Sequence, residues 1–172
     1  MAPASGCRRS IPVRFPSEED PAYAGWHFES GTTKEDGKRW SSVHSPTQAL
    51  LALFLFTDVG AQDAPTLVLR GSHLDVAARL GRADDDGLEW SSVEPHLPPS
   101  TFERDVVSIE GTAGDVFLCH PFLVHRASWP HRGRMPRVMA QPSIWLKEPY
   151  ALTDRAAALP VERAIIAGLD AV

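Results

Sequence analysis

Short apolar runs separated by turn residues set the pattern of this chain. The longest run, 49–56, is continuously apolar and ends at turn residues, which predicts a buried strand. The run at 65–69 is expected to pair with it as a hairpin. The same pattern predicts further strands at 11–15, 105–109, 116–124 with an interruption at Pro121, and 137–145.

Two segments show helical spacing instead. One helix is expected over 72–80, with Ser72 able to cap it and Gly81 at its end. A second helix can begin at Pro160, with Gly168 able to end it. Many short strands with few helices predict a mainly β fold, a sandwich or jelly roll rather than a parallel α/β sheet.

The segment 82–104 follows neither pattern. It is acidic and rich in proline, with three consecutive aspartates at 84–86. Two interpretations are open, a solvated excursion or a mobile flap over a site, and we favour the solvated excursion.

Size and charge narrow the function classes. The 172 residues suit one domain, so we expect a single domain over 1–172, with its core at about 11–146 and a helical tail at 150–172. The net charge of −5 argues against general nucleic-acid binding, which needs a basic face. Because no apolar run approaches the ~20 residues that a membrane span needs, we expect no membrane partner.

The cysteines and the first residues indicate a compartment. Cys7 and Cys119 lie far apart and form no CxxC pair, and Cys119 is expected to be a reduced core residue. Arg8 and Arg9 are not followed by an apolar stretch, so no secretory signal is expected. We therefore expect a cytoplasmic protein.

His27 and Glu29 are the first candidates for chemistry. On a strand, residues two apart point to the same face, so this imidazole and this carboxylate can reach one metal ion. A third ligand from a distant strand would complete a 2-His-1-carboxylate facial triad, which leaves three adjacent positions open, as non-haem Fe(II) oxygenases require. Taken alone, an H-x-E pair is more often a salt bridge or a surface pair.

The third ligand can come from His120 or His125. They lie five residues apart, so on one regular strand they would face opposite ways, although Pro121 can disturb that alternation. His125 lies at the end of the predicted strand, beside a basic loop, where functional sites gather. His120 lies in an apolar run and is expected to be buried and hydrogen-bonded.

Arg137, twelve residues after His125, is a candidate to bind an anion. A fixed guanidinium can pair bidentately with a carboxylate. Arg126, Arg132 and Arg134 are alternatives that we expect to be solvated loop charges. Of the remaining histidines, one is expected to support the first helix and three to be solvated: His73 in the first case, and His44, His96 and His131 in the second.

Four segments carry these candidates: Gly25-Trp26-His27-Phe28-Glu29, Arg70-Gly71-Ser72-His73, the stretch 114–125 (GDVFLCHPFLVH), and Arg137. In this order and spacing they resemble the motifs of the phytanoyl-CoA dioxygenase-like family, over roughly residues 11–146. The resemblance implies a double-stranded β-helix, that is, a cupin-like jelly roll. It implies that His27, Glu29 and His125 hold Fe(II), and that Arg137 binds 2-oxoglutarate. The implied reaction hydroxylates a small organic substrate and releases succinate and carbon dioxide.

The chain departs from the family pattern at three points. Glu29 stands where the family usually has Asp, and Arg70 stands where it usually has Pro. Only 26 residues precede His27, where family members usually carry a longer portion that helps to build the substrate pocket and the sheet edge. We therefore expect an open site, a homodimer that covers the exposed edge, or a truncated product without activity.

Three rival functions differ from this interpretation. A halogenase would carry a small residue in place of the carboxylate, and Glu29 argues against it. A cupin enzyme with another metal would need a tighter histidine cluster, which the sequence lacks. A degenerate jelly-roll module that binds a ligand or partner without turnover stays open.

Overall fold

The computed structural model describes residues 11–19, 25–35, 37–44, 48–83, 87–90 and 93–171. The strands are β1 (Val13–Arg14), β2 (Thr32–Thr33), β3 (Arg39–Ser41), β4 (Gln48–Leu55), β5 (Thr66–Leu69), β6 (Leu88–Glu89), β7 (Val106–Ile109), β8 (Val116–Cys119), β9 (His125–Arg126), β10 (Arg137–Ala140) and β11 (Ser143–Trp145). The helices are α1 (Ser72–Leu80), α2 (Pro99–Phe102) and α3 (Pro160–Asp170).

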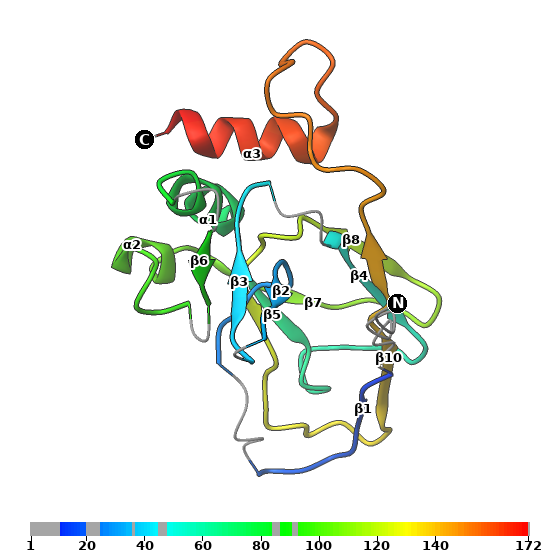
Figure 1. Ribbon diagram of the computed structural model, residues 1–172. Helices are drawn as coiled ribbons and strands as arrows, with labels where there is room; N and C mark the ends of the chain where they lie inside the picture. Colours follow the sequence, from blue (N-terminus) through cyan, green and yellow to red (C-terminus); the bar gives the residue numbers. More distant parts are fainter. Residues whose placement is uncertain are drawn as a thin grey trace.

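These elements form a mainly β fold with antiparallel sheets and a few short helices, as predicted. The helices lie toward one side of the molecule, away from β1 and β10 (Figure 1). Among the described residues, none of the helices is long and apolar enough to cross a membrane.

β4 is the central strand of the first sheet. It pairs with β10 and β11 along one edge and with β8 along the other, and β1 extends the sheet beyond β10. Leu51, Leu53 and Leu55 share one face of β4 and are fully buried. A central strand flanked on both edges accounts for the long apolar run at 49–56.

The second sheet has the order β7-β5-β9, and it corrects two predictions. The predicted hairpin between 49–56 and 65–69 is wrong, because β5 pairs with β7 and β9 rather than with β4. The strand predicted at 116–124 is interrupted at Pro121, as expected, but it does not resume before residue 124: β8 ends at Cys119, and a turn at Pro121 and Phe122 separates it from β9 of the second sheet. In both places a short connection carries the chain from one sheet to the other.

The two sheets face each other across an apolar core. Leu53 and Met139 of the first sheet pack in one cluster with Val68 and Ile109 of the second. Cys119, a free thiol, is half-buried against this cluster, as expected for a core cysteine. Cys7 lies outside the described residues.

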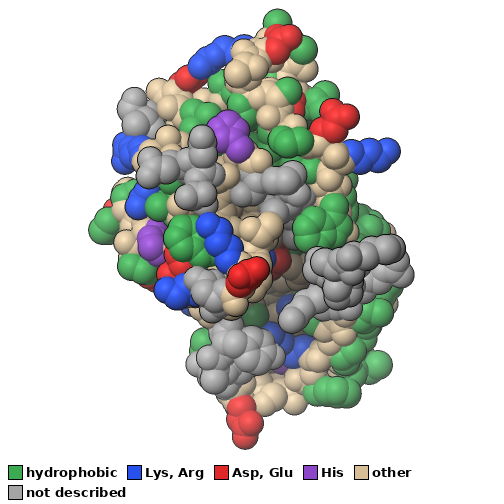
Figure 2. Space-filling view, viewed as in Figure 1, with side chains coloured by type: hydrophobic (Ala, Val, Ile, Leu, Met, Phe, Trp, Pro, Cys, Tyr) green, Lys and Arg blue, Asp and Glu red, His purple; other side chains and the backbone are tan. Residues whose placement is uncertain are grey.

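The outer face of the first sheet is apolar as well. Its directly paired residues are Val13 with Val138, Ala140 and Val116 each with Phe54, Ala52 with Leu118, and Leu50 with Ile144. In Figure 2, hydrophobic side chains gather along the side of the molecule where β4, β8 and β10 lie in Figure 1. Leu118 of β8 is 64% exposed, so this strand is not covered on its outer face.

Helices α1 and α3 pack together over a second apolar core. This core joins Leu69 of the second sheet to Val76 of α1 and Ile165 of α3. α1 ends before Gly81, as predicted, but its N-cap is Gly71 and not Ser72. α3 begins at Pro160 as predicted and continues past Gly168 to Asp170.

The predicted solvated excursion at 82–104 is wrong for most of its described residues. β6 pairs with β3 in a small sheet of order β2-β3-β6. Trp90, Val93 and Leu97 are buried in the second apolar core. The three aspartates at 84–86 lie outside the described residues. Because this segment is acidic overall, its composition did not indicate that Trp90, Val93 and Leu97 belong to the core.

Candidate metal centre

His27 and His125 meet across a β-bridge. Their backbones exchange both hydrogen bonds, at 2.9 Å from His27 N to His125 O and 2.8 Å from His125 N to His27 O. Residues directly opposite each other in an antiparallel pair project to the same face. The two imidazole rings accordingly lie with their centroids 4.3 Å apart. The bridge adds the segment around His27 to the second sheet, next to β9.

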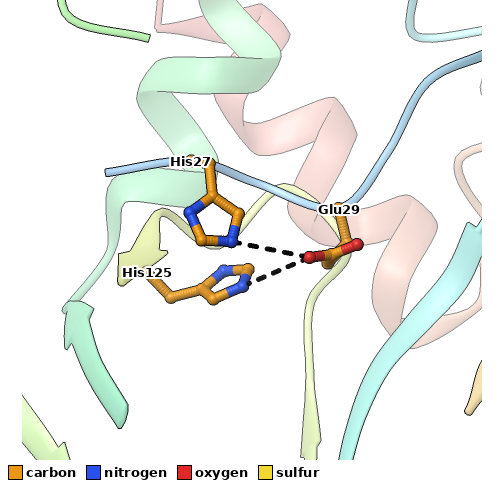
Figure 3. A group of neighbouring side chains, drawn as sticks. All are labelled: His27, Glu29 and His125. Atoms are coloured by element: carbon orange, nitrogen blue, oxygen red, sulfur yellow. Dashed lines mark ion pairs between the residues drawn. The ribbon is translucent and has the colours of Figure 1, made fainter. Parts of the chain in front are cut away.

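Glu29 turns its carboxylate toward both rings (Figure 3). Its Oε1 lies 3.6 Å from Nε2 of His27 and 3.6 Å from Nε2 of His125. The ligand-type atoms of the three residues all lie within 4.8 Å of one another. Adjacent ligands of an octahedral ion bound at ~2.1 Å are about 3 Å apart, so the carboxylate oxygen would have to approach each ring by roughly 0.6 Å, and any wider pair by more, for all three to bind one ion.

Two backbone carbonyls fix which ring nitrogen faces Glu29. Nδ1 of His27 donates to the carbonyl of Gly25, and Nδ1 of His125 donates to the carbonyl of Leu123, both at 2.9 Å. A carbonyl only accepts, so each Nδ1 carries a proton, and in the neutral ring Nε2 is the nitrogen that keeps its lone pair. This is the arrangement that orients metal-binding histidines.

The lone pair of His125 is buried. His125 is 4% exposed, and its Nε2 has no hydrogen-bond partner among the described residues. A buried ring nitrogen without a donor is costly unless another group binds it. A metal ion is such a group, so this atom fits the ligand role.

The electrostatics of the cluster favour a carboxylate anion. Burial alone would raise the pKa of Glu29, but the adjacent His125 and His27 hold that pKa far below its usual range. Burial would likewise lower the pKa of His27, but the Glu29 carboxylate and the Gly25 carbonyl outweigh it and raise that pKa. Glu29 is therefore ionised and can offer a negatively charged oxygen.

Two imidazoles, which bind a metal in their neutral form, and one carboxylate match the facial donor set of a non-haem Fe(II) site. All three project from one side of the second sheet, because His27 and His125 are opposed and Glu29 follows two residues after His27. His125 is also the cross-strand partner of Val68, whose side chain packs in the core between the sheets. The cluster therefore faces the space between the two sheets.

Arg137 lies apart from this cluster, on the first sheet. It is buried, and its guanidinium donates to the backbone carbonyl of Ala64, just before β5. Met139, two residues on, packs in the core between the sheets. Arg137 therefore points toward the second sheet from the opposite layer.

The rival third ligand, His120, is held elsewhere. Its Nδ1 accepts from the backbone N–H of Phe122 at 3.1 Å, and its Nε2 lies 3.3 Å from the carbonyl of Val161 in α3. Burial and the neighbouring His73 lower the pKa of His120 to about 4. The ring of His73 lies 4.9 Å from that of His120, so both support the helices and not the metal centre.

Of the arginines and histidines expected at the surface, some are exposed and one is buried. Arg132 is exposed and pairs with Glu18, and Arg134 and His44 are exposed, as expected. The expectation of a solvated His131 is wrong, because this residue is buried and its backbone bridges to Ser17 and to Asp63.

Two further predicted surface residues are half-buried against tryptophan rings. His96 lies 5.0 Å from the ring of Trp90, and the Arg126 guanidinium lies 4.6 Å over the ring of Trp26.

Several contacts that orient the ligands have no clear signal in the sequence. The carbonyls of Gly25 and Leu123 are backbone groups that every residue type has, so the residue types at these positions do not indicate their role. The hydroxyl of Ser72, in α1, accepts from the backbone N–H of Val124 at 2.9 Å, which fixes the residue before His125. Ser72 of the Gly-Ser-His segment could have indicated this hydrogen bond. Its position before a helical pattern predicts a helix cap instead.

Comparison with known proteins places this geometry in context. The family described as Phytanoyl-CoA dioxygenase (PhyH) matches residues 20–139. No curated protein matches the sequence. Among solved structures the chain is similar to the "non-heme alpha ketoglutarate dependent carbocyclase SnoK from nogalamycin biosynthesis", with a TM-score of 0.57 and 20% identity. That similarity covers 83% of this chain and 49% of SnoK, so the chain spans about half the length of that protein. At this identity the similarity shows the fold.

Proposed function

Since the chain belongs to the phytanoyl-CoA dioxygenase (PhyH) family, we propose that it is an Fe(II)- and 2-oxoglutarate-dependent oxygenase that acts on a small organic substrate. The observation that carries the proposal is the convergence of His27, Glu29 and His125 on one point between the sheets. The family match concerns the sequence motifs, and the convergence concerns the arrangement of the three side chains in the fold.

His27, Glu29 and His125 would hold the iron, and Arg137 would bind the distal carboxylate of 2-oxoglutarate. Bound iron would supply oxygen activation coupled to the decarboxylation of 2-oxoglutarate. The Gly25 and Leu123 carbonyls keep both Nε2 lone pairs directed at the metal position. The burial of Arg137 places its charge where water competes little for a carboxylate.

Production of succinate from 2-oxoglutarate tests the proposal. With Fe(II) and ascorbate, the parent protein should form succinate even without its true substrate. Glu29→Ala should abolish this, because it removes one of only three protein ligands, whereas Glu110→Ala, at an exposed carboxylate, should not. A parent protein that binds iron fully and yields no succinate above a metal-free control would instead favour a ligand-binding module without turnover.

A further inference from the structure

Glu29 poses a geometric problem for a metal ligand. A glutamate side chain has one more rotatable bond than an aspartate, so it loses more conformational entropy when it is fixed. It can also reach an ion with both oxygens, which would occupy one of the positions that 2-oxoglutarate and oxygen need. A glutamate at this position therefore needs a second anchor.

Arg39 supplies such an anchor. Its Nη2 donates to the backbone carbonyl of Glu29 at 2.9 Å and lies 3.7 Å from Oε2 of the same residue. The other carboxylate oxygen, Oε1, faces the two histidines. The Arg39 guanidinium thus contacts the backbone carbonyl and Oε2 of Glu29. Oε1 is left to face the metal position.

The small sheet holds Arg39 in place. Arg39 opens β3, opposite Thr33 of β2, and its backbone carbonyl accepts from the N–H of Trp90 at 2.7 Å. Gly31, two residues after Glu29, has φ +127, and a Cβ there would lie 2.8 Å from the carbonyl oxygen of Trp40 and 3.3 Å from Cγ of Arg39. The chain between Glu29 and β2 therefore passes close against β3, and it keeps Arg39 beside Glu29.

We propose that Arg39 is a positioning residue that restrains Glu29 to bind metal through one oxygen, and so compensates for the longer arm of a glutamate. The Arg39 side chain is 38% exposed, so its charge alone is partly screened by water. Its contribution comes from the two-point contact and not from a buried ion pair. This inference rests on the proposed function, because it takes Glu29 as a ligand.

A double-mutant cycle between Arg39 and Glu29 tests the inference. The dissociation constant for Co(II), as an air-stable probe, should be measured for the parent, Arg39→Ala, Glu29→Asp and the double variant. Arg39→Ala should weaken Co(II) binding by about 10-fold or more, the usual effect of losing an outer-shell partner. In the Glu29→Asp background the same change should cost less than about 2-fold, since the shorter carboxylate withdraws from Arg39.

A spectroscopic readout reports on the number of oxygens bound. Without oxygen, the charge-transfer absorption of the Fe(II)–2-oxoglutarate complex should weaken in Arg39→Ala, because a freed Glu29 competes with the co-substrate for a position. Arg39→Lys should partly restore both readouts, since it keeps a cationic donor near Oε2 but on a shorter side chain without the planar guanidinium. Arg82→Ala, at an exposed arginine after α1, should change neither.

The outcomes separate this inference from the proposed function. Equal losses from Arg39→Ala in the parent and in the Glu29→Asp variant would mean that Arg39 only supports the fold, and would overturn its positioning role. Undiminished Co(II) binding in Arg39→Ala would overturn it as well. A parent that binds Co(II), shows the coupling and yet forms no succinate would contradict the oxygenase and leave the role of Arg39 standing. A parent that binds no metal would overturn both.

Discussion

At the residue scale, backbone geometry decides which atoms of the site face one another. The reciprocal hydrogen bonds between His27 and His125 put both rings on the same face of the second sheet. The Gly25 and Leu123 carbonyls then select the tautomer that leaves each Nε2 lone pair free of a proton. The metal-type geometry therefore follows from main-chain contacts that need no metal ion to form.

Arg137→Ala should weaken 2-oxoglutarate binding by about 30-fold or more. A buried arginine–carboxylate pair loses on the order of 2–5 kcal/mol when one partner is removed, and each ~1.4 kcal/mol is tenfold in affinity. Arg137 is 4% exposed, which places it in this class. Titration of 2-oxoglutarate into the oxygen-free, iron-loaded protein gives the dissociation constant.

Two exposed arginines give the matched controls for Arg137. Arg132→Ala and Arg134→Ala should change 2-oxoglutarate binding by no more than about 0.5 kcal/mol, because both side chains are solvated. Metal binding should survive in Arg137→Ala, since it is not a ligand. A loss carried by Arg134→Ala and absent from Arg137→Ala would show that the anchor is misassigned.

At the scale of elements, the packing of α1 against α3 explains why a glycine lies inside a helix. A Cβ on Gly168 would lie 2.6 Å from the carbonyl oxygen of Leu74 and 2.7 Å from Cβ of Ala77, both in α1. The missing side chain lets the two helices approach closely. α1 in turn carries Ser72, whose hydroxyl fixes the residue before His125, so this packing supports the position of a candidate ligand.

Gly168→Ala should destabilise the protein by about 1–3 kcal/mol, because the added methyl group meets the backbone of α1. Helix propensity alone predicts the opposite sign, since Ala is better than Gly by about 1 kcal/mol inside a helix. Ala167→Gly, at the exposed neighbouring position, should follow propensity and destabilise by about that amount. Urea unfolding measures both, and a stabilising Gly168→Ala would contradict the close packing.

At the scale of the whole molecule, two apolar cores together hold the site. The core between the sheets contains Val68, the partner of His125, and the core under the helices contains Phe28, which lies between His27 and Glu29 in the chain. Phe28, the residue between His27 and Glu29, thus points to the opposite side of the second sheet from the cluster and is buried there. Both cores therefore hold the backbone segments that carry the three side chains.

The homodimer expected to cover an exposed sheet edge stays a prediction, and the apolar outer face of the first sheet, which includes its edge strand β8, is the surface on which we test it. Three of its apolar side chains are well exposed, Val13 at 48%, Val116 at 45% and Leu118 at 64%. The paired residues of this face carry no charge, so it is complementary to a second copy of itself. Light scattering after size-exclusion chromatography should show a dimer.

Leu118→Lys should convert this dimer to a monomer, because it places a charge on the 64% exposed residue of β8. The control is Val106→Lys, at a 52% exposed valine of the second sheet, which should leave the dimer intact. A monomeric parent, or a dimer lost with Val106→Lys and kept with Leu118→Lys, would contradict this interface.

The sequence by itself determined the local features of this protein. Continuous apolar character located β4, helical spacing and Pro160 located the two longer helices, and the alternation of strand side chains paired His27 with Glu29. These features depend on neighbours a few residues apart, so a single sequence contains them. The motif order supplied the family, which residues 20–139 match.

Only the tertiary structure decided which strands pair and where the chain changes layer. The pairing of β5 with β9, the turn that separates His120 from His125, and the burial of Trp90 all depend on contacts between residues far apart in sequence. The same holds for Arg39, which reaches Glu29 through the pairing of β2 with β3. An isolated arginine has no periodicity or motif to mark it, because its role exists only once the backbone of Glu29 passes beside it.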